Sequence, residues 1–434
     1  MLRKILAILI FSFWGLRAGA QDFGESDHRM LQYINQEKWF DAKSLYDSCR
    51  DDLSEVIRLI SGAFLGTYFN KPADGIACAE ELLSKYSGQL GEQAVMYRML
   101  MAKSLASMRN YPKMDSVLTY ILVHDSLYLD DQSRRAMVVA RDQCREIARL
   151  PQLKLVNRLG MSRSTVDMEL RDGLFFLDVD FCGENVKTLL DIGAEYTAID
   201  QSLANELGVY IFQDSLQTTP ASYVKMGIID SMQIGSLTVK NEICYVFPDG
   251  LMARDRELGA DSGITRLRAM LGISTLMKLS AVTIDVVQKT ITFDTAEQPG
   301  QGIVNFMLKD HKPYLWLELN GIPAMMFWDT GMSARPQLSG KFYAEHAASF
   351  PELSPGRKGR HVTFEGVAEY DYRELNNIPV HIALQEVTLP ELRVVSDLDK
   401  LNPGGVATYD GQMNNITEVR QIRIDFENMC VTIE

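Results

Sequence analysis

The sequence lacks the short motifs that mark most hydrolases and nucleotide-binding proteins. It contains no Gly-x-Ser-x-Gly turn for a serine nucleophile and no phosphate-binding P-loop. No cysteine-plus-histidine constellation is evident, and no two of the 6 histidines have metal-ligand spacing. The sequence therefore disfavours serine, cysteine and metallo-hydrolases, and we expect neither a metal nor a cofactor.

Positive charge is scarce as well. The chain has 44 lysine and arginine residues against 57 aspartate and glutamate residues, which gives a formal net charge of −13. The acidic residues are spread out, whereas a nucleic-acid-binding protein is expected to carry a basic patch. We therefore expect no nucleic acid partner.

The 6 cysteines show no disulfide framework, which a chain of 434 residues with an ample core does not need.

Long apolar runs are missing from all of the chain except its N-terminus. There Arg3 and Lys4 precede a short apolar run, and Ala18-Gly19-Ala20 offers a small-x-small cleavage pattern. We predict a signal peptide over residues 1–20, with Gln21 as the first mature residue; an uncleaved N-terminal anchor is the alternative. No later segment reaches about 18 apolar residues. The prediction is an exported bacterial protein, periplasmic or secreted, with no stable membrane span in the mature chain.

The segment that follows has a helical texture. Apolar residues recur at helical spacing over residues 31–46. Three turn-and-helix openings, near Trp39, Pro72 and Tyr111, follow one another at steps of 33 and 39 residues, which bracket the 34-residue period of tetratricopeptide repeats (TPR). We predict a TPR-like helical-hairpin domain over residues 21–155, whose concave surface would contact a protein partner. A plain helical spacer is the alternative.

Two stretches in the rest of the chain, residues 189–197 and 326–333, share one sequence pattern. In each, an apolar strand runs into an aspartate that is followed two residues later by a glycine. A carboxylate at the end of a buried strand is costly unless the protein needs it there. Two carboxylates in contact share one proton, because like charges cannot both ionise. Asp191 and Asp329 are therefore predicted to form a catalytic dyad.

The two copies match beyond these triplets. Gly183 and Gly321 stand at the same distance before the two aspartates, each between alternating segments that predict a strand hairpin. Far downstream each copy closes with another hairpin, at residues 282–293 and 422–433. The near-equal spacing indicates an internal duplication.

Residues 189–197 closely follow the pattern Leu-Leu-Asp-Thr-Gly-Ala-x-x-Thr, and Met270-Leu271-Gly272 resembles an apolar-apolar-Gly motif that packs under an active-site loop. From about Leu174 to the C-terminus, the chain resembles the pepsin/retropepsin superfamily of aspartic proteases in its single-chain, two-lobed bacterial form. The resemblance implies a multi-domain α and all-β fold. The helical domain would be followed by two β-barrel-like lobes, over residues 156–298 and 299–434.

In this family each lobe supplies one aspartate, so the resemblance implies a water held between Asp191 and Asp329. One ionised carboxylate would act as general base, and its protonated partner would donate to the scissile carbonyl oxygen. The implied activity is an exported endopeptidase that acts on peptide or protein substrates. The residues implied to support the active-site loops are Gly193, Ala194, Thr197, Thr330 and Gly331, and the candidate flap residues are Tyr223 and Gly366.

The sequence departs from the family pattern at two places. In the family, two threonine or serine hydroxyls form symmetric hydrogen bonds between the lobes. Ile192 stands at one of these two positions, so half of these hydrogen bonds are missing. Tyr409-Asp410-Gly411, taken as the second counterpart of the apolar-apolar-Gly motif, carries a charge. A further triplet, Asp261-Ser262-Gly263, lacks a preceding strand and is predicted to be a loop. The alternative function is a catalytically weakened module that binds peptides or a partner protein.

Overall fold

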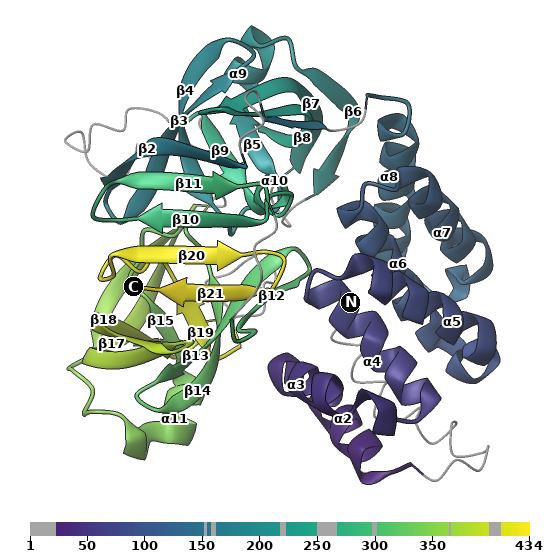
Figure 1. The fold of residues 1–434 in the computed structure, drawn as a ribbon, viewed down its shortest axis with the longest axis horizontal. Coiled ribbons are helices and arrows are strands. Elements are labelled where there is room, and N and C mark those ends of the chain that lie inside the picture. Colours follow the sequence, from purple (N-terminus) through teal and green to yellow (C-terminus); the bar gives the residue numbers. More distant parts are fainter. Residues whose placement is uncertain are drawn as a thin grey trace. The chain divides into compact units, whose positions relative to one another are not determined.

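Figure 1 shows the fold of the computed structural model. The structure describes residues 23–151, 154–157, 162–217, 223–249, 267–296, 302–363, 366–398 and 409–434. They form two units, a helical unit that ends at Leu150 and a β-rich unit that begins at Pro151. The predicted order of a helical region before a β-rich region is confirmed. The predicted signal peptide lies outside the described residues, and the domain limits at residues 155 and 298 stay predictions.

The helical unit is built from helical hairpins. Its helices are α2 (Glu25–Asn35), α3 (Trp39–Cys49), α4 (Glu55–Tyr68), α5 (Pro72–Leu90), α6 (Ala94–Ser107), α7 (Tyr111–His124) and α8 (Asp131–Ile147). The three predicted openings begin α3, α5 and α7. Just before them, Glu37, Asn70 and Arg109 have φ values of 55°, 52° and 54°, a left-handed conformation that ends a helix and turns the chain. The TPR-like assignment stays a prediction.

Aromatic side chains fill the core of this unit. Trp39 packs edge to face on Tyr68 with ring centroids 4.9 Å apart, and Phe64 lies 5.4 Å from Trp39. All three rings are fully buried. Among the described residues, no helix combines the length and the apolar character needed to cross a membrane.

The β-rich unit has two lobes. Lobe 1 contains β1 (Lys154–Asn157), β2 (Arg163–Arg171), β3 (Leu174–Phe181), β4 (Glu184–Asp191), β5 (Thr197–Asp200), β6 (Tyr210–Gln217), β7 (Tyr223–Ile234), β8 (Leu237–Phe247), β9 (Ala269–Gly272), β10 (Ala281–Asp285) and β11 (Thr290–Asp294), with α9 (Gln201–Glu206) and α10 (Ile273–Leu276). Lobe 2 contains β12 (Phe306–Lys309), β13 (Lys312–Leu319), β14 (Ile322–Trp328), β15 (Gln337–Ser339), β16 (Arg357–Thr363), β17 (Gly366–Ile382), β18 (Gln385–Val395), β19 (Gly411–Met413), β20 (Gln421–Asp425) and β21 (Cys430–Ile433), with α11 (Gly340–His346).

The two lobes share one order of strands around their Asp-Gly segments. β4, which ends at Asp191, pairs in parallel with β9; β9 pairs with β5, and β5 pairs in parallel with β8. β14, which ends just before Asp329, pairs in the same way with β19, then β15, then β18. The two aspartates therefore occupy matching positions in the two lobes.

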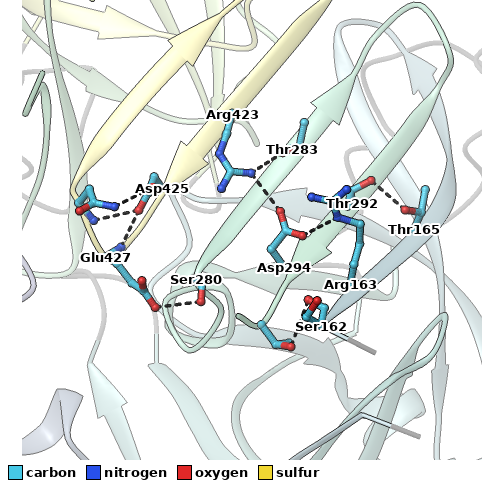
Figure 2. Close-up of polar contacts among 12 residues, drawn as sticks. Ser162, Arg163, Thr165, Ser280, Thr283, Thr292, Asp294, Arg423, Asp425 and Glu427 are labelled. Carbon is cyan, nitrogen blue, oxygen red and sulfur yellow. Dashed lines mark hydrogen bonds and ion pairs between the residues drawn. The ribbon is translucent and has the colours of Figure 1, made fainter. Parts of the chain in front are cut away.

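The predicted closing hairpins join the lobes. They are β10–β11 and β20–β21, which lie side by side in Figure 1 because β10 pairs antiparallel with β20, from Ala281 opposite Asp425 to Asp285 opposite Gln421. Side chains reinforce this sheet (Figure 2). The carboxylate of the buried Asp294 accepts from Arg163 Nε of lobe 1 at 2.7 Å and from Arg423 Nη1 of lobe 2 at 3.0 Å.

Candidate active site

Tight turns lead into the two strands that carry the aspartates. In the β3–β4 turn, Cys182 and Gly183 have φ values of 54° and 100°, and in the β13–β14 turn, Asn320 and Gly321 have 50° and 79°. Two successive positive φ values are the signature of a two-residue hairpin turn that fixes strand register. The glycines predicted to turn the chain thus bring each following strand to its aspartate in the same register.

The loops after the two strands meet between the lobes. A Cβ atom added to Gly193 would lie 2.4 Å from Asp329 Oδ1, and one added to Gly331 would lie 2.3 Å from Asp191 Oδ2. Each carboxylate therefore packs against the bare backbone of the glycine in the opposite loop. Only glycine leaves this space, so the Asp-x-Gly spacing is what allows each carboxylate to lie against the opposite loop.

Backbone amides orient both carboxylates. Ala194 N–H donates to Asp191 Oδ1 at 3.1 Å, and Gly331 N–H donates to Asp329 Oδ1 at 2.8 Å. Asp191 is buried and Asp329 is half-buried. These hydrogen bonds fix the orientation of each carboxylate relative to the backbone of its own loop.

Thr330 ties the lobe 2 loop to the lobe 1 loop. Its hydroxyl accepts from Ile192 N–H and donates to Leu190 C=O, both at 2.9 Å. Ile192 is fully buried, and its side chain has no polar atom to return these bonds. The structure therefore contains the inter-lobe hydrogen bonds of the Thr330 hydroxyl, but not the matching bonds that a hydroxyl at position 192 would make.

Thr197 connects the lobe 1 loop to a buried polar chain. Its hydroxyl accepts from Gly272 N–H at 3.2 Å and lies 2.7 Å from Thr275 Oγ1. The Thr275 hydroxyl donates to Glu242 Oε1 at 3.0 Å, and Lys278 Nζ lies 3.6 Å from the same oxygen. Glu242 is fully buried. Sequence analysis missed it, because Glu242 directly follows Lys240 and Asn241 in β8, a polar run that gives no sign of a buried side chain.

Sequence analysis assigned the lobe 2 counterpart of Met270-Leu271-Gly272 to the wrong residues, Tyr409-Asp410-Gly411. In lobe 1, Leu271 pairs with the residue before Asp191. In lobe 2, Met413 pairs with Trp328, the residue before Asp329. The matching segment is therefore residues 412–414, three residues beyond the predicted one. The apolar position is kept at Met413, and the charge of Asp410 lies outside the motif.

A hairpin turn of lobe 2 reaches the lobe 1 loop, which the sequence did not predict. Lys312 Nζ donates to Gly193 C=O at 2.8 Å, and His311 Nε2 lies 3.7 Å from Glu195 Oε1. Glu195 also accepts from Tyr245 OH at 3.4 Å. Burial and the adjacent Glu195 carboxylate raise the pKa of Tyr245 well above its usual value, so the hydroxyl keeps its proton.

The candidate flap residues lie at the tips of two hairpins. Tyr223 begins β7 and pairs with Gln217 of β6, and Gly366 begins β17 and pairs with Thr363 of β16. The Tyr223 side chain and the Asp261 triplet lie outside the described residues. Within the part of the chain that is described, no group of three or more His, Cys, Asp or Glu side chains could hold a metal ion.

Comparison with known proteins agrees with the resemblance seen in the sequence. Residues 177–274, which include Asp191 and its loop, match a family model described as aspartyl protease. The resemblance to the aspartic protease superfamily is thereby confirmed for this part of lobe 1, and it supports a peptidase-like function. No curated protein sequence matches the chain.

Solved structures similar to this chain include three proteins. A retropepsin-like aspartic protease from Rickettsia conorii is 18% identical, with 33% of this chain and 93% of that chain covered and a TM-score of 0.22. Basic 7S globulin from soybean is 10% identical, with 63% and 94% covered and a TM-score of 0.36. An aspartic proteinase from Irpex lacteus is 10% identical, with 63% and 97% covered and a TM-score of 0.39.

Proposed function

We propose that the protein is an aspartic-type endopeptidase that hydrolyses peptide bonds with a water activated between Asp191 and Asp329. The observation that carries this proposal is the reciprocal packing of each carboxylate on the opposite glycine, Gly331 or Gly193. Two carboxylates brought to one point share a proton, because like charges in contact cannot both ionise. The pair then offers one base and one acid.

The chain's own groups suit the two roles. The ionised aspartate takes a proton from the water as it attacks the scissile carbonyl carbon, while the protonated aspartate donates to the carbonyl oxygen. The N–H groups of Ala194 and Gly331 hold the carboxylates in orientation, and Thr330 fixes one loop against the other. No covalent intermediate is needed.

We further propose that the enzyme is exported and acts on peptides or unfolded proteins, with the helical unit available to a protein partner. Support for export comes from the charged, apolar and small-residue pattern of residues 1–20. N-terminal sequencing of exported protein should give Gln21 as the first residue. Retention of the first 20 residues on a membrane-bound product would contradict this.

The test of catalysis is cleavage of an unfolded protein from acidic to neutral pH, with and without the transition-state mimic pepstatin. Asp191→Asn and Asp329→Asn should each abolish cleavage and leave folding intact, because each carboxylate has its own role. Asp261→Asn is the control and should cleave normally, since the sequence predicts no strand before its triplet. Cleavage that survives either dyad substitution would rule the mechanism out.

The buried Ile192 favours a second candidate function, a module that binds peptides without cutting them. Calorimetry with pepstatin separates the two functions. A protein that binds pepstatin but cleaves nothing at any pH is the binding module. Pepstatin affinity that Asp329→Asn leaves unchanged would place the binding site elsewhere.

A further inference from the structure

Asn415 lies at the junction of the two lobes and bonds with both. Its side-chain Nδ2 donates to Thr330 C=O at 2.9 Å and to Gly173 C=O at 2.6 Å. Thr330 belongs to the loop of Asp329, whereas Gly173 lies in the β2–β3 turn of lobe 1. The Asn415 side chain is buried, and both of its amide hydrogens are used.

The segment that carries Asn415 is itself fixed to the lobe 2 loop. Asp329 N–H donates to Met413 C=O at 2.9 Å, and Trp328 Nε1 donates to Asn414 C=O at 3.1 Å. Asn415 follows directly, so its side chain is held in a constant position relative to Asp329. A contact between Asn415 and lobe 1 therefore acts on the catalytic loop.

Asn415 and Ile192 bond to the same residue of the lobe 2 loop. Asn415 Nδ2 donates to Thr330 C=O, and Ile192 N–H donates to the Thr330 hydroxyl, both at 2.9 Å. Because the two loops occupy matching positions in the lobes, a hydroxyl at position 192 would bond to the lobe 2 loop, just as the Thr330 hydroxyl bonds to Ile192 N–H and Leu190 C=O. The isoleucine side chain cannot do so.

We propose that Asn415 is a positioning residue that takes over the inter-lobe hydrogen bonding lost with a hydroxyl at position 192, and so keeps Asp329 aligned with Asp191. This inference rests on the proposed peptidase function. The donor orientation is the favourable one, because turning the amide over would set Oδ1 against two carbonyl oxygens. As oriented, Oδ1 has no hydrogen-bond partner among the described residues.

The test begins with Asn415→Leu, which removes both donors and keeps the size of the side chain. We expect kcat for peptide cleavage to fall by about ten- to a hundredfold, with KM changing less, because misplaced loops affect the reacting geometry more than binding. Adding Ile192→Thr should restore most of kcat, since the new hydroxyl would tie the same two loops.

The chain offers a matched control in Asn305. This buried lobe 2 asparagine donates to Val431 C=O at 2.9 Å and accepts from Val431 N–H at 2.7 Å. Asn305→Leu should lower the stability of the protein. Adding Ile192→Thr to Asn305→Leu should not raise kcat, unlike its addition to Asn415→Leu. An unchanged kcat in Asn415→Leu, or a loss that Ile192→Thr does not restore, would overturn the proposal.

Absence of all cleavage by the unmodified protein would be a failure of the proposed function, and a second measurement then judges Asn415. The free energy of unfolding in denaturant is compared with and without Ile192→Thr, in the unmodified chain and in Asn415→Leu. Neighbouring groups that serve one loop show coupled effects, so Ile192→Thr should stabilise the Asn415→Leu protein more. Equal effects in the two backgrounds would refute the role of Asn415.

Discussion

Gly193 and Gly331 leave open the space that the opposing carboxylates fill. An added methyl group would lie 2.4 Å from Asp329 Oδ1 at position 193 and 2.3 Å from Asp191 Oδ2 at position 331. Gly193→Ala and Gly331→Ala should therefore each push the dyad apart and lower kcat/KM by about a hundredfold, because a displacement of about 1 Å at the reacting groups has that effect. Steady-state cleavage of a peptide measures it.

Gly356→Ala provides the control for these substitutions. A Cβ atom at Gly356 would meet nothing within 4 Å, so this variant should cleave at the normal rate. If Gly331→Ala matched the control, the carboxylates would not meet across the glycines, and the proposed site would be wrong.

Which residues the sequence revealed depended on distance along the chain. Asp191 and Asp329 could be predicted because strand, aspartate and glycine are neighbours in sequence, and a local pattern carries that information. Lys312 and Asn415 reach the loops from residues more than 80 positions away. Such contacts arise from tertiary packing, which no local periodicity encodes.

At the scale of strands, local hairpins were predicted correctly but pairing between distant strands was not. The hairpins β10–β11 and β20–β21 follow from alternation and turn residues. Their union through β10 and β20 joins residues about 140 apart and cannot be deduced from either hairpin alone. The apolar-apolar-Gly counterpart in lobe 2 was predicted three residues too early for the same reason, since β19 pairs with β14, which lies far upstream.

The corrected register gives Asp410 a different role. Its Oδ2 accepts from Met325 N–H at 2.8 Å, outside the apolar motif. Burial raises the pKa of Asp410 above its usual value of 3.8, so the folded state binds this proton more tightly than the unfolded chain does. The stability that the Asp410 side chain contributes is therefore fully present below the pKa of the unfolded chain. It is lost as the pH rises through the pKa of the folded state.

Asp410→Asn should therefore stabilise the protein at neutral pH, because the amide oxygen can still accept from Met325 N–H and no charge is buried. The gain should disappear as the pH falls below the usual aspartate pKa. Melting temperatures across this pH range measure it, with Asp371→Asn on an exposed position of β17 as control. A gain that persists at low pH, or one equal to that of the control, would contradict the account.

At the scale of the whole β-rich unit, the relative position of the lobes depends on the shared sheet of β11, β10, β20 and β21. Polar side chains cross it (Figure 2). Arg423 of lobe 2 donates to Asp294 Oδ2 and to Thr283 Oγ1 of lobe 1, at 3.0 and 3.2 Å. Ser280 Oγ donates to Glu427 Oε1 at 2.8 Å. These bonds hold the lobes, and with them the loops of Asp191 and Asp329, in one arrangement.

Arg423→Met should lower the free energy of unfolding by about 1–3 kcal/mol, because it leaves the buried Asp294 carboxylate with Arg163 as its remaining arginine partner. Arg171→Met is the matched control. The Arg171–Glu169 pair lies within β2, with the two side chains 32% and 39% exposed, and exposed pairs contribute only about 0–1 kcal/mol. Denaturant unfolding compares the two variants. Equal losses would mean that the arginine between the lobes contributes no more than one on the surface. A larger loss for Arg423→Met, together with reduced kcat, would show that the shared sheet also sets the geometry of the two aspartates.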